Sequence, residues 1–223
     1  MKISCIIAAL NEEKQIANVL DAALKAKEKI PMEIIVVDDG SNDSTPHILK
    51  GYKGIRVLTN NSNKGKSYSV ARGIEASKGE YILLLDADLF GLTADNIHDL
   101  ITPVQLGVAE VTMSIRKNYV RTKLESITGE RVFPRSLVNG HLDKMKELPN
   151  FSLEVFLNDL IIKGQYPIKA VNWVNVVNKN KTKRRGFYRG WKENIGATRD
   201  VFRIMPFKEA TRQHNALKKL LVK

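Results

Sequence analysis

Cysteine is almost absent from this sequence, in which Cys5 is the only one among 223 residues. One cysteine cannot form a disulfide within the chain. This excludes a fold held together by internal disulfides and fits a reducing compartment. Because Cys5 lies in an apolar run, we interpret it as a small buried hydrophobic residue.

The sequence also lacks a long hydrophobic run. No window approaches the roughly 20 apolar residues that a membrane-spanning helix needs. The apolar stretch of residues 3–10 is short and leads directly into Asn11-Glu12-Glu13-Lys14, a pattern unlike a secretory signal peptide. We therefore expect a cytoplasmic protein that is soluble or lies peripherally at the inner face of the membrane.

Three further absences exclude or disfavour particular kinds of site. Gly65-Lys66-Ser67 is not a P-loop, because that motif needs a glycine at position 60, where the sequence has asparagine. Residues 7–13 contain no glycine, which disfavours a nucleotidyltransferase with a glycine-rich N-terminal loop. The histidines show no spacing typical of metal ligands or of a nucleophile and its base, and we assign no role to His47, His98, His141 and His214.

Positive charge is concentrated in the second half of the chain. Residues 1–115 carry 12 Lys and Arg against 15 Asp and Glu, whereas residues 116–223 carry 24 against 9. Such a basic surface suits nucleic acid, an anionic membrane or a phosphorylated small molecule. A basic nucleic-acid-binding protein stays an alternative, but no recognition motif or aromatic-interleaved basic strand supports it, so we expect no nucleic-acid partner.

Strands and helices alternate along the first half of the chain, which predicts a mostly parallel sheet with helices on both faces. Short apolar runs indicate buried strands, and apolar residues at three- and four-residue spacing indicate helices. The predicted strands are 3–8, 32–37, 55–59, 81–85 and 108–115, and the predicted helices are 12–27, a helix from Thr45 with Pro46 at its first position, 66–76 and 93–106.

The second half of the chain is less regular. We expect a polar loop over 117–131, a helix over 151–163, a strand over 168–177, a basic loop over 178–185 and amphipathic helices over 190–205 and 208–222. The last two combine apolar and basic residues, as interfacial helices at an anionic membrane do, although packing against the domain explains them equally. We expect one continuous α/β domain, with 1–115 binding a donor and 116–223 binding an acceptor; a homodimer is left open.

Polar clusters follow the predicted strands at 11–12, 38–39, 63–66 and 86–88. The carboxyl ends of parallel strands share one edge of the sheet, where ligands bind in folds of this kind. Four segments distant in sequence therefore converge on one crevice. Asp38 or Asp39 can accept a hydrogen bond there from a nucleobase or simply cap a helix, and Glu12 can reach a nucleoside or favour a helix N-terminus.

Three stretches resemble family 2 glycosyltransferases of the GT-A fold: Ile7-Ala8-Ala9-Leu10-Asn11-Glu12-Glu13, Ile34 to Asp43 with its Asp38-Asp39-Gly40-Ser41 turn, and Leu83-Leu84-Leu85-Asp86-Ala87-Asp88. The resemblance implies a sugar donor linked to a nucleoside diphosphate, with UDP-sugars favoured. The residues it implies for binding this donor are Ala8, Leu10, Asn11, Glu12, Asp38, Asp39, Ser41, Lys66, Asp86, Ala87 and Asp88.

The resemblance also implies Mn²⁺ or Mg²⁺ as cofactor, held by Asp88 and Asp86. Asp88 is the firmer ligand, and Asp86 also contacts hydroxyls of the donor. Many relatives place a metal-binding histidine in the late loop, but this sequence reads Val177-Asn178-Lys179 there. Either Asn178 takes its place, or the metal has only Asp88, the diphosphate and water.

The second half is similar, more loosely, to dolichyl-phosphate mannose synthases and glucosyl-phosphoglycerate synthases. Gly129-Glu130-Arg131 corresponds to their acceptor-side segment, and Phe151-Ser152-Leu153-Glu154 to a segment that ends in an acidic residue. We predict Glu154 as general base, with Asp159 second, and Asp86 as the other catalytic residue. The predicted contacts to the acceptor or diphosphate are Arg131, Arg184 and Arg185.

The predicted function is metal-dependent transfer of a sugar from a nucleotide-sugar to a hydroxyl or phosphate acceptor, which can be lipid-linked, with inversion at the anomeric carbon. Retaining transfer to a phosphorylated small acceptor is the alternative, because the phosphoglycerate-type relatives retain configuration.

Overall fold

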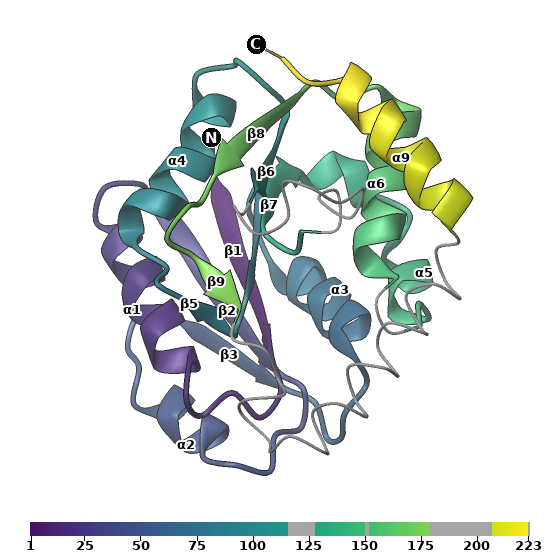
Figure 1. Cartoon of the computed structure of the whole chain (residues 1–223). Coiled ribbons are helices and arrows are strands. Elements are labelled where there is room, and N and C mark those ends of the chain that lie inside the picture. Colours follow the sequence, from purple (N-terminus) through teal and green to yellow (C-terminus); the bar gives the residue numbers. More distant parts are fainter. Residues whose placement is uncertain (116–127, 150–151, 179–206, 223) are drawn as a thin grey trace.

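A computed structural model describes residues 1–115, 128–149, 152–178 and 207–222 (Figure 1). Its centre is a seven-stranded sheet in the order β3-β2-β1-β4-β7-β6-β8, with helices on both faces. Only β7 runs antiparallel to its neighbours, so the predicted mostly parallel α/β fold is confirmed.

The first four main strands form the parallel half of the sheet: β1 (Ile3–Ala9), β2 (Met32–Asp38), β3 (Arg56–Thr59) and β4 (Tyr81–Asp86). β1 and β2 are buried along nearly their whole length, as their unbroken apolar sequences predict. The helices that connect these strands are α1 (Ile16–Lys27), α2 (Thr45–Lys50) and α3 (Lys66–Ala76).

Helix α1 begins at Ile16, four residues later than the sequence predicts. The backbone N–H groups of Glu12 and Glu13 donate to the side chains of Thr45 and Asp43 in the neighbouring loop, at 2.8 and 3.2 Å. Residues 12–15 therefore form a turn that is hydrogen-bonded to the loop before α2. A contact of this kind between two loops cannot be predicted from the helical spacing of apolar residues.

Helix α4 (Ala94–Gln105) begins where predicted. The Thr93 hydroxyl accepts from the Asn96 backbone N–H, and the Asn96 side chain accepts from the Thr93 backbone N–H, forming a capping box. The short strand β5 (Leu89–Phe90) precedes this helix, and β6 (Val111–Ile115) follows it.

The remaining described elements are β7 (Arg131–Pro134), the 3-10 helix η2 (Arg135–Val138), α5 (Leu142–Lys146), α6 (Leu153–Gly164), β8 (Ile168–Asn172), β9 (Val177–Asn178) and α9 (Phe207–Lys219). The predicted strand over 168–177 is wrong in its extent. Trp173 interrupts it with a fully buried ring, after which β9 leaves the main sheet and pairs with β5.

The predicted polar loop over 117–131 is also wrong at its end, because Arg131 begins the buried strand β7. Residues 116–127 lie outside the described part of the chain, as do the predicted loop from 179 onward and the predicted helix over 190–205. Among the described helices, none combines the length and the apolar character that crossing a bilayer requires.

Two apolar clusters enclose the sheet. One packs β1, β2 and β4 against α1 and α4, and Trp173 belongs to it. The other packs the opposite face against α3, α5, α6 and α9 (Figure 1). Cys5 is fully buried in the first cluster, as predicted, and burial raises the pKa of its thiol. Helices cover both faces of the sheet. The loops therefore lie together at its remaining edge, where the parallel strands have their carboxyl ends.

Candidate active site

The strand-end clusters predicted to converge meet at one edge of the sheet. Ala9 at the end of β1 pairs with Asp38 at the end of β2, and Ala8 pairs with Asp86 at the end of β4. The third predicted cluster, which follows β3, reaches the same edge because Asp38 pairs with Thr59.

Side chains tie the loop after β1 to the loop after β2. The Asn11 backbone N–H donates to the Ser41 hydroxyl at 2.9 Å, and the Asn42 N–H donates to the Asn11 side-chain oxygen at 2.9 Å. Asn11 has a left-handed backbone, with φ of 56°, which asparagine tolerates better than most residues. Asn11 and Ser41 thus hold the shape of this edge, and their contacts to a donor stay predictions.

Asp39 holds the loop that leads into α3. Its carboxylate accepts hydrogen bonds from the backbone N–H groups of Lys64 and Gly65 and from the Asn60 side chain, at 2.9, 2.8 and 2.7 Å. Gly40 lets the turn after β2 approach the backbone of this loop closely, since a Cβ at position 40 would lie 2.8 Å from the Ser62 carbonyl carbon. Its φ of 75° also favours glycine.

Asp38 is almost fully buried and accepts a hydrogen bond from the Ser41 N–H at 3.0 Å. This bond closes a local turn; the helix cap offered as the alternative interpretation is not made by Asp38, because α2 begins later, at Thr45. A carboxylate can accept several hydrogen bonds, so the turn leaves room for the second interpretation, a contact to a nucleobase.

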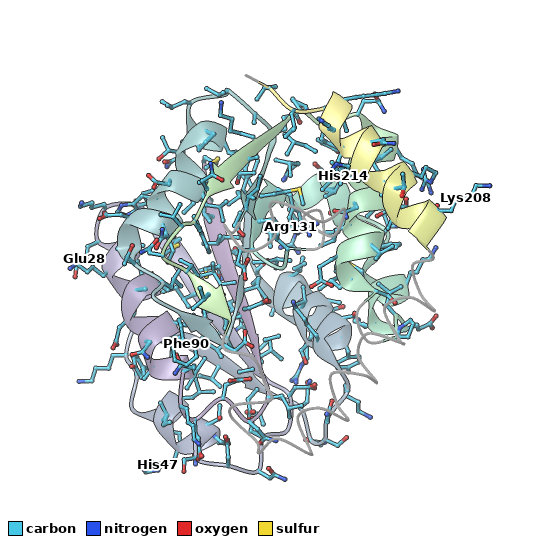
Figure 2. The ribbon with its side chains drawn as sticks, in the orientation of Figure 1. Glu28, His47, Phe90, Arg131, Lys208 and His214 are labelled. Carbon is cyan, nitrogen blue, oxygen red and sulfur yellow. The ribbon has the colours of Figure 1, made fainter. Side chains whose placement is uncertain are left out.

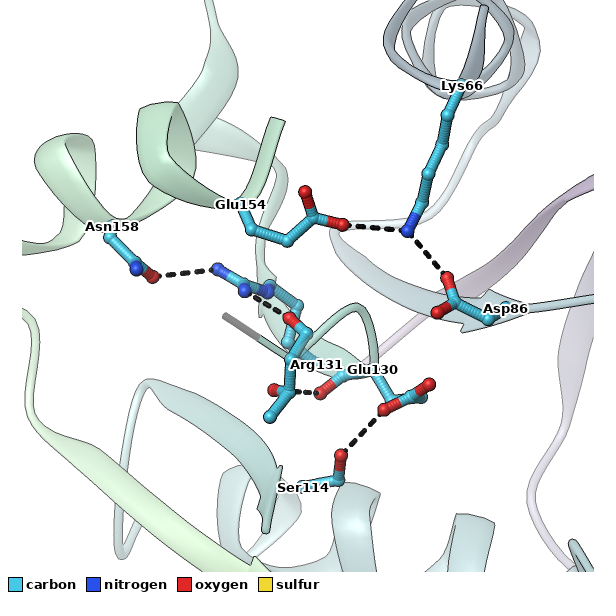
Figure 3. A network of polar contacts seen from close by, with 8 residues as sticks. Lys66, Asp86, Ser114, Glu130, Arg131, Glu154 and Asn158 are labelled. Atoms are coloured by element: carbon cyan, nitrogen blue, oxygen red, sulfur yellow. Dashed lines mark hydrogen bonds and ion pairs between the residues drawn. The ribbon is translucent and has the colours of Figure 1, made fainter. Parts of the chain in front are cut away.

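Lys66 joins two carboxylates that are far apart in sequence (Figure 3). It is the first residue of α3, and its Nζ lies 2.7 Å from Asp86 Oδ1 and 2.7 Å from Glu154 Oε1. Partial removal of the ammonium from water lowers the pKa of Lys66, but the two carboxylates outweigh this effect and hold that pKa well above its ordinary value.

Glu154 lies in the first turn of α6, where the helix dipole favours a negative charge. Only 8% of the residue is exposed, yet the carboxylate reaches the same ammonium as Asp86. The two predicted catalytic residues therefore share one site, although 68 positions separate them in the sequence.

Asp86 is confined on its other side by Gly129. A Cβ at position 129 would lie 2.5 and 2.6 Å from the two carboxylate oxygens of Asp86, so only glycine fits here without displacing that side chain. The sequence prediction included Gly129 in a motif but did not reveal this contact, because no local pattern records which strand end a loop will touch.

Arg131, which is labelled in Figure 2, is fully buried, and its contact to the acceptor or diphosphate stays a prediction. Its guanidinium donates to the Asn158 side chain at 3.1 Å and to the Thr128 carbonyl. Burial lowers the pKa of Arg131, and the nearby carboxylates of Glu154, Glu130 and Asp86 act in the opposite direction.

The other two predicted arginines, Arg184 and Arg185, lie outside the described residues. Glu130, beside Arg131, is also fully buried and accepts from the Ser114 hydroxyl at 2.8 Å. The sequence prediction assigned no role to Ser114 or Glu130, because a charged residue in a polar stretch is ordinarily exposed.

Asp88 lies in the turn between β4 and β5 and is partly exposed. Its neighbour Leu89 pairs with Asn178 of β9, so the backbone of Asn178 lies beside the acidic turn. Across the described residues there is no cluster of three or more His, Cys, Asp and Glu side chains that could hold a metal without help from a ligand.

A model of glycosyl transferase family 2 matches residues 4–156, which include every strand-end cluster described above. The chain belongs to glycosyl transferase family 2. Dolichyl-phosphate beta-glucosyltransferase of Dictyostelium discoideum is 29% identical to this transferase over 179 residues, covering 73% of this chain. The human protein of the same name is 37% identical over 100 residues, covering 39% of this chain and 31% of its own length.

This family 2 chain spans 50% of the length of the Dictyostelium relative. Among solved structures, glucosyl-3-phosphoglycerate synthase of Mycobacterium tuberculosis with Mn²⁺ and UDP-glucose has a TM-score of 0.70 at 23% identity, covering 91% of this chain and 77% of that chain. TarS of S. aureus has a TM-score of 0.58 at 21% identity, covering 73% and 56%. The fold is thus the GT-A fold of these glycosyltransferases, as predicted.

Proposed function

We propose that this family 2 domain transfers a hexose from a UDP-sugar to a hydroxyl or phosphate acceptor, with inversion at the anomeric carbon. The proposal rests on one observation: the carboxylates of Asp86 and Glu154 both form ion pairs with the Lys66 ammonium. They do so at the edge of the sheet where the loops after β1 and β2 meet. Asp86 is suited to binding the sugar donor, and Glu154 is suited to removing a proton from the acceptor.

The residues at the end of β4 fit a divalent cation. Asp86 and Asp88 supply hard oxygen ligands of the kind that Mg²⁺ and Mn²⁺ prefer. Asn178 lies next to this turn in the β5–β9 pair and is our candidate third ligand. When bound, the cation would neutralise the charge that develops on the leaving diphosphate. With so few protein ligands, we expect it to bind tightly only together with the nucleotide.

The donor's nucleoside would lie over the ends of β1 and β2. Asp38 supplies a buried acceptor for a base N–H, and a buried hydrogen bond of this kind gives strong discrimination between bases. Ala8 and Leu10 border the same edge and are partly exposed. Solved structures of the same fold hold UDP, which supports a uridine nucleotide for this chain.

Glu154 would act as general base. Its carboxylate is nearly buried and lies within reach of Lys66, whose ammonium also contacts the predicted donor ligand Asp86. Removal of the acceptor's proton by a positioned carboxylate contributes about 10²- to 10⁴-fold to such a reaction. The name of the Dictyostelium relative specifies a beta-glucosyl product, which supports a direct, inverting transfer here.

A lipid phosphate is our proposed acceptor, because the curated relatives are named for dolichyl phosphate. The exposed residues of α9 include Lys208, Arg212, Lys218 and Lys219. A basic helix face of this kind attracts anionic headgroups by charge. We therefore propose peripheral contact with an anionic membrane near the acceptor side.

The experiment that tests the function is a thermal-shift panel of UDP- and GDP-sugars with and without Mn²⁺, followed by transfer assays with the donor it identifies. We expect a UDP-sugar to stabilise the protein only with the metal present. NMR of the product's anomeric proton then distinguishes inversion from retention.

Matched variants assign the residues. Asp88→Ala should abolish metal-dependent stabilisation, whereas Asp95→Ala, an exposed carboxylate in the first turn of α4, should leave it unchanged. Glu154→Gln should keep donor binding and lower transfer by about 10²-fold or more. An Asp88→Ala protein with full metal-dependent activity would overturn the proposal.

A further inference from the structure

A line of fully buried polar side chains runs from the C-terminal helix to the candidate active site. Gln213 of α9, Asn158 of α6 and Arg131 of β7 all have no exposed surface. Burying a polar group in an apolar interior costs free energy unless the group is hydrogen-bonded. Each hydrogen bond in such a line therefore orients the side chain that makes the next one.

The contacts can be followed from α9 inward. Gln213 Nε2 donates to the Val155 carbonyl at 3.2 Å and to Asp159 at 3.0 Å, which anchors its amide on α6. Asn158 Nδ2 donates to Gln213 Oε1 at 3.4 Å, and Asn158 Oδ1 accepts from Arg131 Nη1 at 3.1 Å. One amide thus orients the next, and the second orients the guanidinium.

Arg131 in turn fixes the segment that touches Asp86. Its Nη2 donates to the Thr128 carbonyl, one residue before Gly129, where the space for a Cβ is taken by the Asp86 carboxylate. The Nε of Arg131 has no hydrogen-bond partner within the described ranges, so its two Nη bonds set the position of the guanidinium. Figure 3 shows this guanidinium beside Glu154, one helical turn from Asn158 on α6.

We propose that Asn158 and Gln213 are positioning residues for the reaction, acting through Arg131 on both Asp86 and Glu154. The C-terminal helix α9 therefore sets the geometry of the active site, in addition to packing against α6. This inference rests on the proposed function for its kinetic consequences, but the structural linkage does not depend on it.

The test compares polar and apolar changes in the same helices. Asn158→Leu removes the acceptor for Arg131, Asn158→Asp keeps that acceptor, and Gln213→Leu removes the anchor of Asn158. The matched control is Leu217→Ala, one helical turn after Gln213 on the same buried side of α9, which removes apolar packing and no hydrogen bond of this line. All rates are measured well below the melting temperature of each variant.

We expect Asn158→Leu to lower kcat by about 10- to 100-fold and Gln213→Leu by about 3- to 10-fold, with the donor KM changed less than about 3-fold. Asn158→Asp should recover most of the kcat, and Leu217→Ala should keep it while lowering Tm. The inference is overturned if Asn158→Asp is no better than Asn158→Leu, or if Leu217→Ala loses as much kcat as Gln213→Leu.

A readout without substrate separates this inference from the proposed function. Hydrogen exchange of residues 128–134 should speed up in Gln213→Leu and stay at the wild-type rate in Leu217→Ala. Unchanged exchange in Gln213→Leu would refute the linkage even in an active enzyme. A wild-type protein that transfers no sugar would refute the function while leaving the exchange result to decide the linkage. If Asn158→Leu does not fold, Gln213→Leu and Asn158→Asp carry the comparison.

Discussion

A methyl group at position 129 should selectively damage the active site. In Gly129→Ala the new Cβ would stand 2.5 and 2.6 Å from the Asp86 oxygens, whereas a tolerable contact needs roughly 3.2 Å. Asp86 must therefore move by roughly 0.7 Å, away from a geometry in which Lys66 Nζ lies 2.7 Å from its Oδ1. A shift of about 1 Å in a reacting group costs on the order of 10²-fold in rate.

We expect Gly129→Ala to lower kcat by about 10- to 100-fold and to change the free energy of unfolding little, because the displaced atoms are the end of the flexible Asp86 side chain. The assay is steady-state transfer with the donor found by the thermal-shift panel, together with denaturant unfolding.

Gly51→Ala is the matched control, because its Cβ would meet nothing nearer than the Ile48 carbonyl at 3.3 Å and its φ of −76° suits alanine. It should change stability by less than about 1 kcal/mol and leave kcat unchanged. Wild-type kcat in Gly129→Ala would show that the Asp86 position is not critical, and would refute the reasoning.

Two further predictions concern stability and reactivity. The Tyr52 hydroxyl donates to Asp21 at 2.9 Å and also lies 3.2 Å from the Ala17 carbonyl oxygen, and burial, then the hydrogen bond to Asp21 and its charge, raise the pKa of Tyr52 to about 12. Tyr52→Phe should cost about 1 kcal/mol at pH 8, measured by denaturant unfolding. Because the folded pKa lies above the ordinary value of 10, this difference should shrink as the pH rises from 10 to 12; a difference that stays constant would contradict the assignment. Cys5 should resist thiol reagents in the native protein and react at the rate of unfolding, since burial raises the pKa of its thiol and excludes the reagent. Rapid labelling without loss of structure would disprove its burial.

Sequence reasoning succeeded where structure is set by neighbours along the chain. Apolar runs placed β1, β2 and β4, and the Thr93 cap placed the start of α4. It failed at Trp173 and at Arg131. In the first case one ring is buried in the core and ends a strand early; in the second, a charged residue is buried where Asn158 and the Thr128 carbonyl accept hydrogen bonds from it.

For the candidate site, the sequence by itself determined that acidic clusters follow several parallel strands, and parallel strands bring their carboxyl ends to one edge. Only the tertiary structure decided that Lys66 joins Asp86 to Glu154 and that Gly129 confines Asp86. The physical reason is distance along the chain. Lys66 and Glu154 are 88 residues apart, and a contact between the first turns of two helices leaves no periodic trace in either of them.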